Sequence, residues 1–220
     1  MHIFVPRESK AGERRVAIVP DVIAKYLRAG FTVAVEGGAG VHALADDESL
    51  RSAGATIASA SEISKADVVL SVNPLTAEQF SQLKKGAITI SFLSPNQSLD
   101  AISASAKAGA TSFSLELVPR ISRAQSMDAL TSQALCAGYR AALVAAELAP
   151  RFFPLLMTAA GTVTPANVVV LGAGVAGLQA IATARRLGAV VSAYDVRPAS
   201  ADEVRSMGRS EEHTSELQSH

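Results

Sequence analysis

Residues 167–195, NVVVLGAGVAGLQAIATARRLGAVVSAYD, contain the pattern that decides the fold of this chain. A valine-rich run ends at Leu171, a glycine-rich turn follows, and a helical pattern continues to Leu187. A second run of strand-forming residues then ends at Asp195. Because two strands joined by a helix of this length pair in parallel, the segment predicts a βαβ unit in an α/β fold.

The turn between the first strand and the helix fits the pattern G-x-G-x-x-G. Gly172 permits a tight turn, Gly174 lets the backbone approach a pyrophosphate, and Gly177 allows the helix to pack against the strand. The start of the helix, at Val175 and Ala176, offers unpaired N–H groups and a positive dipole end to phosphates. The alternative is that the glycines serve helix–strand packing alone.

Asp195 lies at the end of the second strand, 23 residues after Gly172. Its carboxylate can accept hydrogen bonds from both hydroxyls of a ribose, and its charge would repel a 2′-phosphate. The pattern therefore favours NAD(H) over NADP(H). Arg197 opposes this inference, because a basic residue there could bind a 2′-phosphate.

The rest of the chain alternates short strand patterns with helical patterns. Strands are predicted at residues 2–5, 32–36, 66–72, 87–93 and 111–118, and helices at residues 20–29, 76–84, 99–108 and 129–148. We predict two Rossmann-like parallel-sheet domains, the second incomplete. Residues 1–125 form the first, residues 126–159 a connecting helix and linker, and residues 160–208 the first half of the second.

Composition excludes several classes of protein. Twenty basic and twenty acidic residues cancel among 220, so nothing indicates nucleic acid as a partner. The apolar runs stay near eleven residues, whereas a membrane-spanning helix needs about twenty, so we expect no direct membrane insertion.

Residues 209–220, RSEEHTSELQSH, look like a translated sequencing adapter and are interpreted as an artefact. The alternative is a genuine disordered tail.

Residues 120–128, RISRAQSMD, form a polar run between a strand and a helix. Taken alone, this is a solvated loop in which Ser126 caps the helix and Asp128 is favoured by its dipole. Together with AGYRAAL and the glycine turn, however, PRISRAQSMDAL closely resembles the NAD(H)-binding component of proton-translocating transhydrogenase. The opening, VPRESKAGERRVAIVPDVI, and VEGGAG also fit its relative alanine dehydrogenase. The resemblance covers residues 1–208, and RISRAQSMD is specific to the transhydrogenase branch.

The resemblance implies roles for individual residues. Arg120 and Asp128 would hold the carboxamide of a bound nicotinamide and set which ring face is presented. Gln125 would lie at the junction with the nucleotide of the partner. Val175 would lie against the cofactor, and Arg197 near its adenosine end. The resemblance assigns no metal site.

The resemblance also implies a reaction and partners. Hydride would pass directly between NADH and NADP+, the latter held by a partner subunit, and no acid or base is needed because no proton accompanies the hydride. The implied partners are NADP(H)-binding and membrane-spanning transhydrogenase subunits and a second copy in a homodimer. The implied location is the cytoplasmic face of the inner membrane of a bacterium.

Two alternatives compete with this hypothesis. An enzyme like alanine dehydrogenase needs proton-handling groups, and that family uses a lysine and a histidine where this chain has Ser71 and Ser94. Ser71 also departs from transhydrogenases, which keep a lysine there. Arg15, the carboxylate-binding residue of alanine dehydrogenase, is shared by both branches. A non-enzymatic NAD-binding module would have no need of RISRAQSMD.

Overall fold

The computed structural model describes residues 1–197 of the chain. The chain divides into two compact units, Met1–Asp128 and Ala129–His220, and each is described by itself. The domain boundaries predicted at residues 125 and 160 stay predictions. Residues 198–208 of the predicted second domain, and the predicted artefact at residues 209–220, lie outside the described residues.

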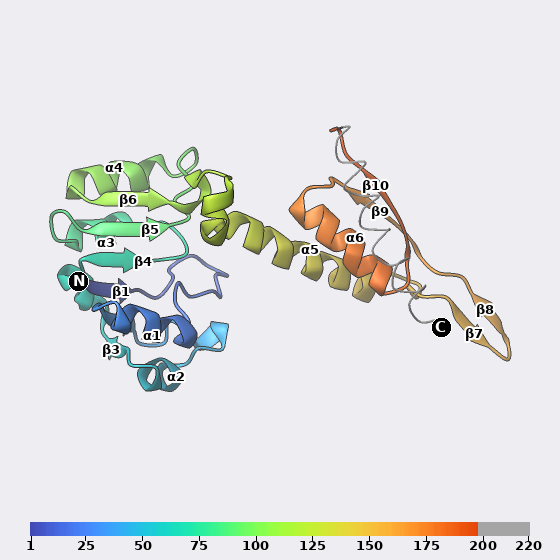
Figure 1. Ribbon diagram of the computed structural model, residues 1–220, viewed down its shortest axis with the longest axis horizontal. Coiled ribbons are helices and arrows are strands. Elements are labelled where there is room, and N and C mark those ends of the chain that lie inside the picture. Colours follow the sequence, from blue (N-terminus) through green and yellow to red (C-terminus); the bar gives the residue numbers. More distant parts are fainter. Residues whose placement is uncertain (198–220) are drawn as a thin grey trace. The chain divides into compact units, whose positions relative to one another are not determined.

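The first unit contains a sheet of six strands in the order β3-β2-β1-β4-β5-β6 (Figure 1). The strands are β1 (His2–Val5), β2 (Thr32–Glu36), β3 (Thr56–Ala58), β4 (Val68–Leu70), β5 (Ile88–Ser91) and β6 (Thr111–Ser114). All five strand pairs are parallel. All carboxyl ends therefore lie at one edge of the sheet, and the chain order reverses between β1 and β4, where such sheets form a crevice.

Short helices connect the strands of the first unit. The α-helices are α1 (Pro20–Arg28), α2 (Asp47–Ser52), α3 (Ala77–Gln82) and α4 (Leu99–Ala108). The 3-10 helices are η1 (Val41–Ala43), η2 (Ala60–Lys65), η3 (Leu115–Leu117) and η4 (Ser122–Met127). Local sequence sets their ends: Pro20 begins α1, Thr76 and Gln79 form a capping box before α3, and Gly109 ends α4 in the left-handed conformation.

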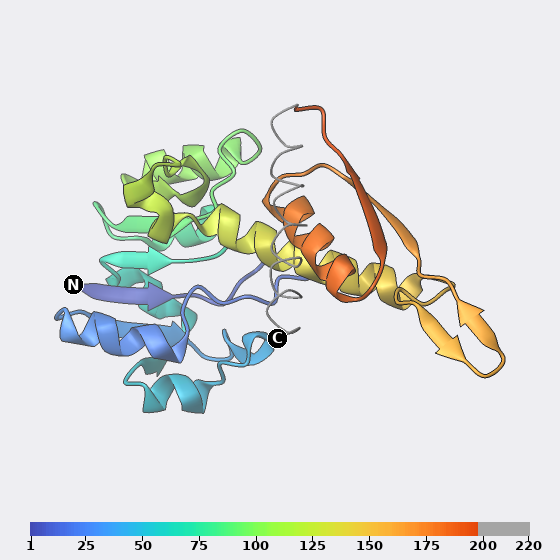
Figure 2. The ribbon, with the colours of Figure 1, turned by 45° about the vertical axis from the view of Figure 1, so that its right-hand side comes forward.

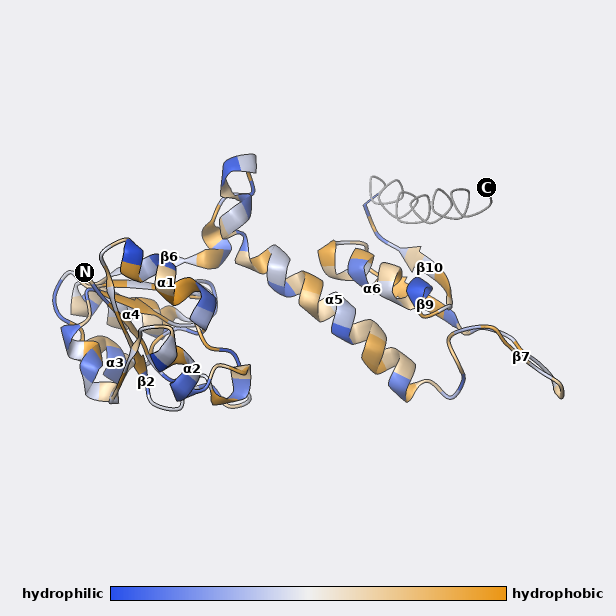
Figure 3. Cartoon of the chain, turned by 60° about the horizontal axis from the view of Figure 1, so that its bottom comes forward, coloured by the Kyte–Doolittle hydropathy of each residue, from blue (hydrophilic) through white to orange (hydrophobic). Residues whose placement is uncertain are grey.

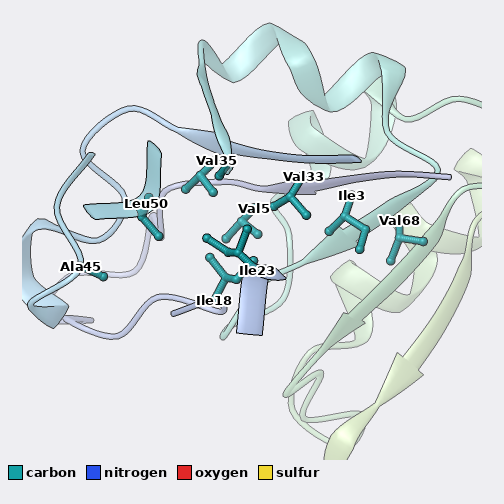
Figure 4. Packing of buried hydrophobic residues seen from close by; sticks show 10 residues of the cluster. Ile3, Val5, Ile18, Ile23, Val33, Val35, Ala45, Leu50 and Val68 are labelled. Atoms are coloured by element: carbon teal, nitrogen blue, oxygen red, sulfur yellow. The ribbon is translucent and has the colours of Figure 1, made fainter. Parts of the chain in front are cut away.

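The strands bury both faces of the sheet because successive side chains point to opposite sides. Ile3 and Val5 of β1 belong to one apolar cluster, which also contains Ile23 of α1 (Figure 4). Phe4, between them, belongs to a second cluster, which contains Phe80 of α3. Burying each of these large side chains contributes about 1.5–3 kcal/mol, so the doubly covered sheet is the stable frame of this unit.

The second unit is a small βαβ layer with a long helix and a β-hairpin. Its members are α5 (Ala129–Leu148), β7 (Leu156–Thr158), β8 (Gly161–Val163), β9 (Asn167–Leu171), α6 (Val175–Arg186) and β10 (Val190–Tyr194). β9 and β10 pair in parallel, and β7 and β8 form an antiparallel hairpin that extends away from β9 and α6 (Figures 1 and 2). A small core of mostly alanine lies among α5, α6 and β9. Apolar and polar residues are mixed around α5 (Figure 3). No helix among residues 1–197 is long and apolar enough to cross a bilayer.

The predicted fold class, α/β with parallel sheets, is confirmed. Several predicted strands are longer than the observed ones: β4 lacks the flanks of residues 66–72, and β6 stops at Ser114, where η3 begins. Three further features, β3, α2 and the hairpin within the predicted linker, were not predicted from the sequence. These elements have three to six residues, too short for periodicity to reveal.

Candidate functional site

The glycine turn leads from β9 into α6 as predicted from its sequence. Gly172 has φ +95°, a conformation that residues with a side chain rarely adopt. A Cβ on Gly174 would meet nothing within 4 Å, so the backbone faces open space there. Val175 and Ala176 form the first turn of α6, and no side chain caps its start. A turn of this kind suits the pyrophosphate of a dinucleotide, because uncapped N–H groups face an accessible space.

Gly177 packs against the turn itself rather than mainly against the strand. A Cβ at this position would lie 1.8 Å from the carbonyl oxygen of Gly172 and 3.6 Å from Val170 of β9. The first distance is impossible and the second is an ordinary contact. Any side chain at residue 177 would therefore push α6 away from the turn.

Asp195, directly after β10, connects the second strand to the glycine turn. Its Oδ2 accepts a hydrogen bond from the main-chain N–H of Ala173 at 2.7 Å. Its carboxylate also forms an ion pair with Arg197, with 3.1 Å between Arg197 Nε and Asp195 Oδ1. The Arg197 side chain first, and then the main-chain N–H groups, hold the pKa of Asp195 well below its ordinary value. The carboxylate is therefore ionised at neutral pH and is an acceptor only.

Gly138, in the middle of α5, is a site residue that was not predicted from the sequence. A Cβ there would lie 2.1 Å from the carbonyl oxygen of Ala176, in the first turn of α6. The missing side chain thus lets α5 approach the start of the helix that follows the glycine turn. A glycine inside a helical pattern was the available signal, because it weakens a helix unless packing requires it.

The polar run RISRAQSMD folds mostly as the 3-10 helix η4. Ala124 is buried and anchors it, whereas Arg120 and Gln125 are exposed. Asp128 directly precedes α5, and its main-chain N–H donates to the carbonyl oxygen of Gln125 at 3.2 Å. Ser126 lies inside η4 and not at the start of α5, so it does not have the position of a helix cap. The first unit thus presents these polar side chains from an ordered segment.

Glu116 holds the chain just before this polar segment. Its carboxylate accepts hydrogen bonds from the main-chain N–H groups of Leu93 at 3.0 Å and Ser94 at 2.6 Å, and from the hydroxyl of Ser114 at 2.5 Å. Burial raises the pKa of Glu116, but these hydrogen bonds outweigh burial and lower it. The end of β5 is therefore fixed to the segment that follows β6.

Glu8 fixes the end of β4 in the same way. Its carboxylate accepts the main-chain N–H of Val72 at 2.6 Å and that of Asn73 at 3.1 Å. The side-chain amide of Asn73 donates to the same carboxylate at 2.9 Å. This acidic residue is thus a main-chain clamp at the crevice between β1 and β4.

Arg15 and Glu13 form a close pair at the same edge. Arg15 Nε and Nη2 donate to the two carboxylate oxygens of Glu13 at 2.8 and 2.6 Å. Arg15 also lies 6.0 Å from the centre of the Phe92 ring. The side-chain hydrogen bonds with Arg15 lower the pKa of Glu13 to about 2, and those with Glu13 raise the pKa of Arg15. Glu13 is therefore an anion across the physiological range and not a proton carrier.

Ser71 and Ser94 follow the neighbouring strands β4 and β5. Ser71 is buried, and its hydroxyl donates to the carbonyl oxygen of Asn73 at 2.7 Å. Ser94 has φ +48°, an unusual conformation for a residue with a side chain. Neither side chain titrates near neutral pH, so neither residue can act as an acid or base in the way that a lysine or histidine does.

Comparison with known proteins agrees with this geometry. Residues 4–137 match the family described as alanine dehydrogenase/PNT, N-terminal domain, and residues 141–220 match its C-terminal domain. The chain is 52% identical over 215 residues to the first of the parts that make up NAD(P) transhydrogenase subunit alpha of Rhodospirillum rubrum, covering 94% of this chain and 56% of that protein. It thus spans about half the length of the curated relatives it matches.

Two solved structures show the same fold. The crystal structure of transhydrogenase from Sinorhizobium meliloti aligns with a TM-score of 0.91 at 50% identity, covering 94% of this chain and 63% of that one. A structure of L-alanine dehydrogenase aligns with a TM-score of 0.80 at 26% identity, covering 94% of this chain and 58% of that one. Both branches of the family are therefore similar to this chain in fold, and the transhydrogenase branch is the more similar in sequence.

Proposed function

This chain belongs to the alanine dehydrogenase/PNT family, and on that premise we propose that it is the NAD(H)-binding component of a proton-translocating transhydrogenase. In this role it serves direct hydride transfer from NADH to NADP+ held by a partner subunit. The observation that carries the proposal is the ordered polar segment at residues 120–128, which presents Arg120 and Gln125 to solvent. Segments that position a cofactor for a partner must be both ordered and accessible.

The residues have separate tasks in this proposal. The backbone of the glycine turn binds the pyrophosphate, and Asp195 binds the adenosine ribose. Arg120 and Asp128 hold the carboxamide, and Gln125 lies toward the nucleotide of the partner. Bound NADH supplies the hydride from its nicotinamide. Because no proton moves with the hydride, the chain contributes position and exclusion of water rather than an acid or base.

The histidines of the described residues agree with chemistry that needs no proton carrier. His2 lies at the amino end of β1, where its Nδ1 is 2.8 Å from the hydroxyl of Thr32, and His42 is exposed in η1. Neither follows the carboxyl end of a strand in the crevice between β1 and β4, where ligands bind in such sheets. Both are therefore left outside the proposed site.

The partners in this proposal are an NADP(H)-binding subunit, a membrane-spanning subunit and a second copy of the chain. The names of the relatives, which are subunit alpha or a portion of it, support an assembly of several subunits. The location that follows is the cytoplasmic face of a bacterial inner membrane. These assignments are part of the proposal, because the chain covers only 56% of the length of its Rhodospirillum rubrum relative.

The alanine dehydrogenase alternative fits the first unit less well. Interconverting an amine and a keto acid requires groups that take up and release protons, and Ser71 and Ser94 cannot do so. Arg15 is engaged by Glu13 in a bidentate pair. A non-enzymatic NAD-binding module has no use for the polar segment at residues 120–128.

The experiment that tests the proposal is Asp128→Asn, assayed with the NADP(H)-binding component of a relative such as that of Rhodospirillum rubrum. Hydride transfer should slow by about 10²-fold, because small losses of alignment have effects of this size. NADH affinity, measured by fluorescence titration, should change much less. Asp100→Asn, an exposed change in α4 of the same unit, is the matched control and should leave both unchanged. Equal losses in transfer and affinity would show that Asp128 does not position the nicotinamide.

A further inference from the structure

The carboxylate of Asp195 is fully occupied by donors of the chain itself. Oδ1 accepts from the main-chain N–H of Arg197 at 2.8 Å and from its Nε at 3.1 Å. Oδ2 accepts from the main-chain N–H of Ala173 at 2.7 Å and from Arg197 Nη2 at 3.1 Å. A carboxylate has about four lone-pair sites. These four donors therefore leave no site for the hydroxyls of a ribose.

The four donors differ in how easily they can leave. Ala173 is completely buried in the glycine turn, and the N–H of Arg197 is held by the main chain two residues from Asp195. The side chain of Arg197, in contrast, is 60% exposed. It contributes one donor to each oxygen, so its withdrawal frees one acceptor site on Oδ1 and one on Oδ2.

We propose that the Arg197 side chain is a displaceable cover on Asp195, and that Arg197 thereby sets the selectivity between adenine nucleotides with and without a 2′-phosphate. The inference rests on the proposed function, since it assumes an adenosine ribose at Asp195. The two freed sites match the two adjacent hydroxyl donors of an unphosphorylated ribose. A ligand with a 2′-phosphate lacks one of these donors and brings negative charge toward Asp195.

The cover has opposite effects on the two ligands. An unphosphorylated ribose must displace the guanidinium, which lowers its affinity. A 2′-phosphate can pair with the same guanidinium, which offsets some of its repulsion by Asp195. Asp195 alone would favour the unphosphorylated ligand. Arg197 therefore makes the ratio between the affinities for the unphosphorylated and the 2′-phosphorylated ligand smaller than Asp195 alone would make it.

The test uses the 220-residue chain with ADP-ribose and 2′-phospho-ADP-ribose, which lack the nicotinamide. Isothermal titration calorimetry should show that Arg197→Gln binds ADP-ribose about two- to five-fold more tightly, the range expected for an exposed ion pair. The same variant should bind 2′-phospho-ADP-ribose more weakly. Arg197→Lys should lie between wild type and Arg197→Gln, because lysine keeps the charge but not the two-pronged geometry. Arg186→Gln, an exposed change at the far end of α6, controls for net charge and should leave the ratio of affinities unchanged.

Each other outcome has a defined meaning. An unchanged ratio in Arg197→Gln, with measurable binding, overturns the role of Arg197 and leaves the nucleotide site standing. No ADP-ribose binding by wild type or any variant overturns the cover together with the nucleotide site. The expected selectivity change, combined with no hydride transfer in the partner assay, overturns the proposed reaction but supports the cover.

Discussion

Gly138→Ala tests whether the close approach of α5 and α6 positions the glycine turn. The ideal Cβ at residue 138 would lie 2.1 Å from the carbonyl oxygen of Ala176 and 2.8 Å from its carbonyl carbon. Both are main-chain atoms, so no side chain can rotate to make room. The two helices must separate, or α6 must shift at its first turn.

The magnitude follows from two opposing effects. Ordinary Cβ contacts begin at 3.4 Å, so the helices must separate locally by about 1.3 Å, the difference between 3.4 and 2.1 Å. Overpacking of this kind costs about 1–3 kcal/mol. Replacing glycine by alanine inside a helix is favourable by about 1 kcal/mol. We therefore expect a net destabilisation between about 0 and 2 kcal/mol, together with weaker ADP-ribose binding because Ala176 belongs to the first turn of α6.

The assay combines urea unfolding, followed by circular dichroism, with hydrogen exchange read by mass spectrometry. Exchange should accelerate in peptides of α5 and α6 and stay unchanged in peptides of β1 to β6. Ala137→Gly, at the exposed neighbouring position, is the control and should cost about 1 kcal/mol through helix propensity without weakening ADP-ribose binding. If Gly138→Ala instead stabilises the chain by about 1 kcal/mol, helix propensity alone sets the change in stability. The close approach of α5 and α6 would then not require a glycine at residue 138.

Two further predictions concern charged groups. Glu13, whose pKa falls from 4.5 to about 2 on folding, contributes stability that is fully present above pH 4.5 and is lost as pH falls toward 2. We expect about 1–2 kcal/mol after allowing for the partly exposed Arg15, so urea unfolding of Glu13→Gln should depend less steeply on pH in that window; parallel curves would contradict this. Asp195→Ala should weaken NADH binding and relax discrimination against NADPH in competition titrations, and unchanged discrimination would show that the ribose binds elsewhere.

Much of the fold could be predicted because its signals are local. The strands β1, β2 and β9, and the long helix α5, have the predicted bounds, since each has a clear apolar pattern and a distinct stop. The glycine turn was also recognisable, because a positive φ at Gly172 and the absence of room at Gly177 permit few other residues.

The roles of the acidic residues could not be predicted in the same way. Glu8 contacts residues 64 and 65 positions away, and Glu116 contacts residues 22 and 23 positions away. Such contacts depend on which strand ends become neighbours, and no local periodicity encodes that. Gly138 was missed for a related reason, because its partner in α6 is 38 positions distant in the sequence.

The carboxylates of Glu8 and Glu116 hold the main chain at the carboxyl ends of β4 and β5. Their hydrogen bonds are to the main-chain N–H groups of residues 72–73 and 93–94. These hydrogen bonds do not involve the side chains of Ser71 and Ser94. A substitution at Ser94 therefore leaves these main-chain bonds in place, whereas a substitution at Ser71 also removes the hydrogen bond that its hydroxyl donates to the carbonyl oxygen of Asn73. A protein engineer who wished to introduce a proton-handling side chain at either position would therefore start from strand ends that Glu8 and Glu116 already hold.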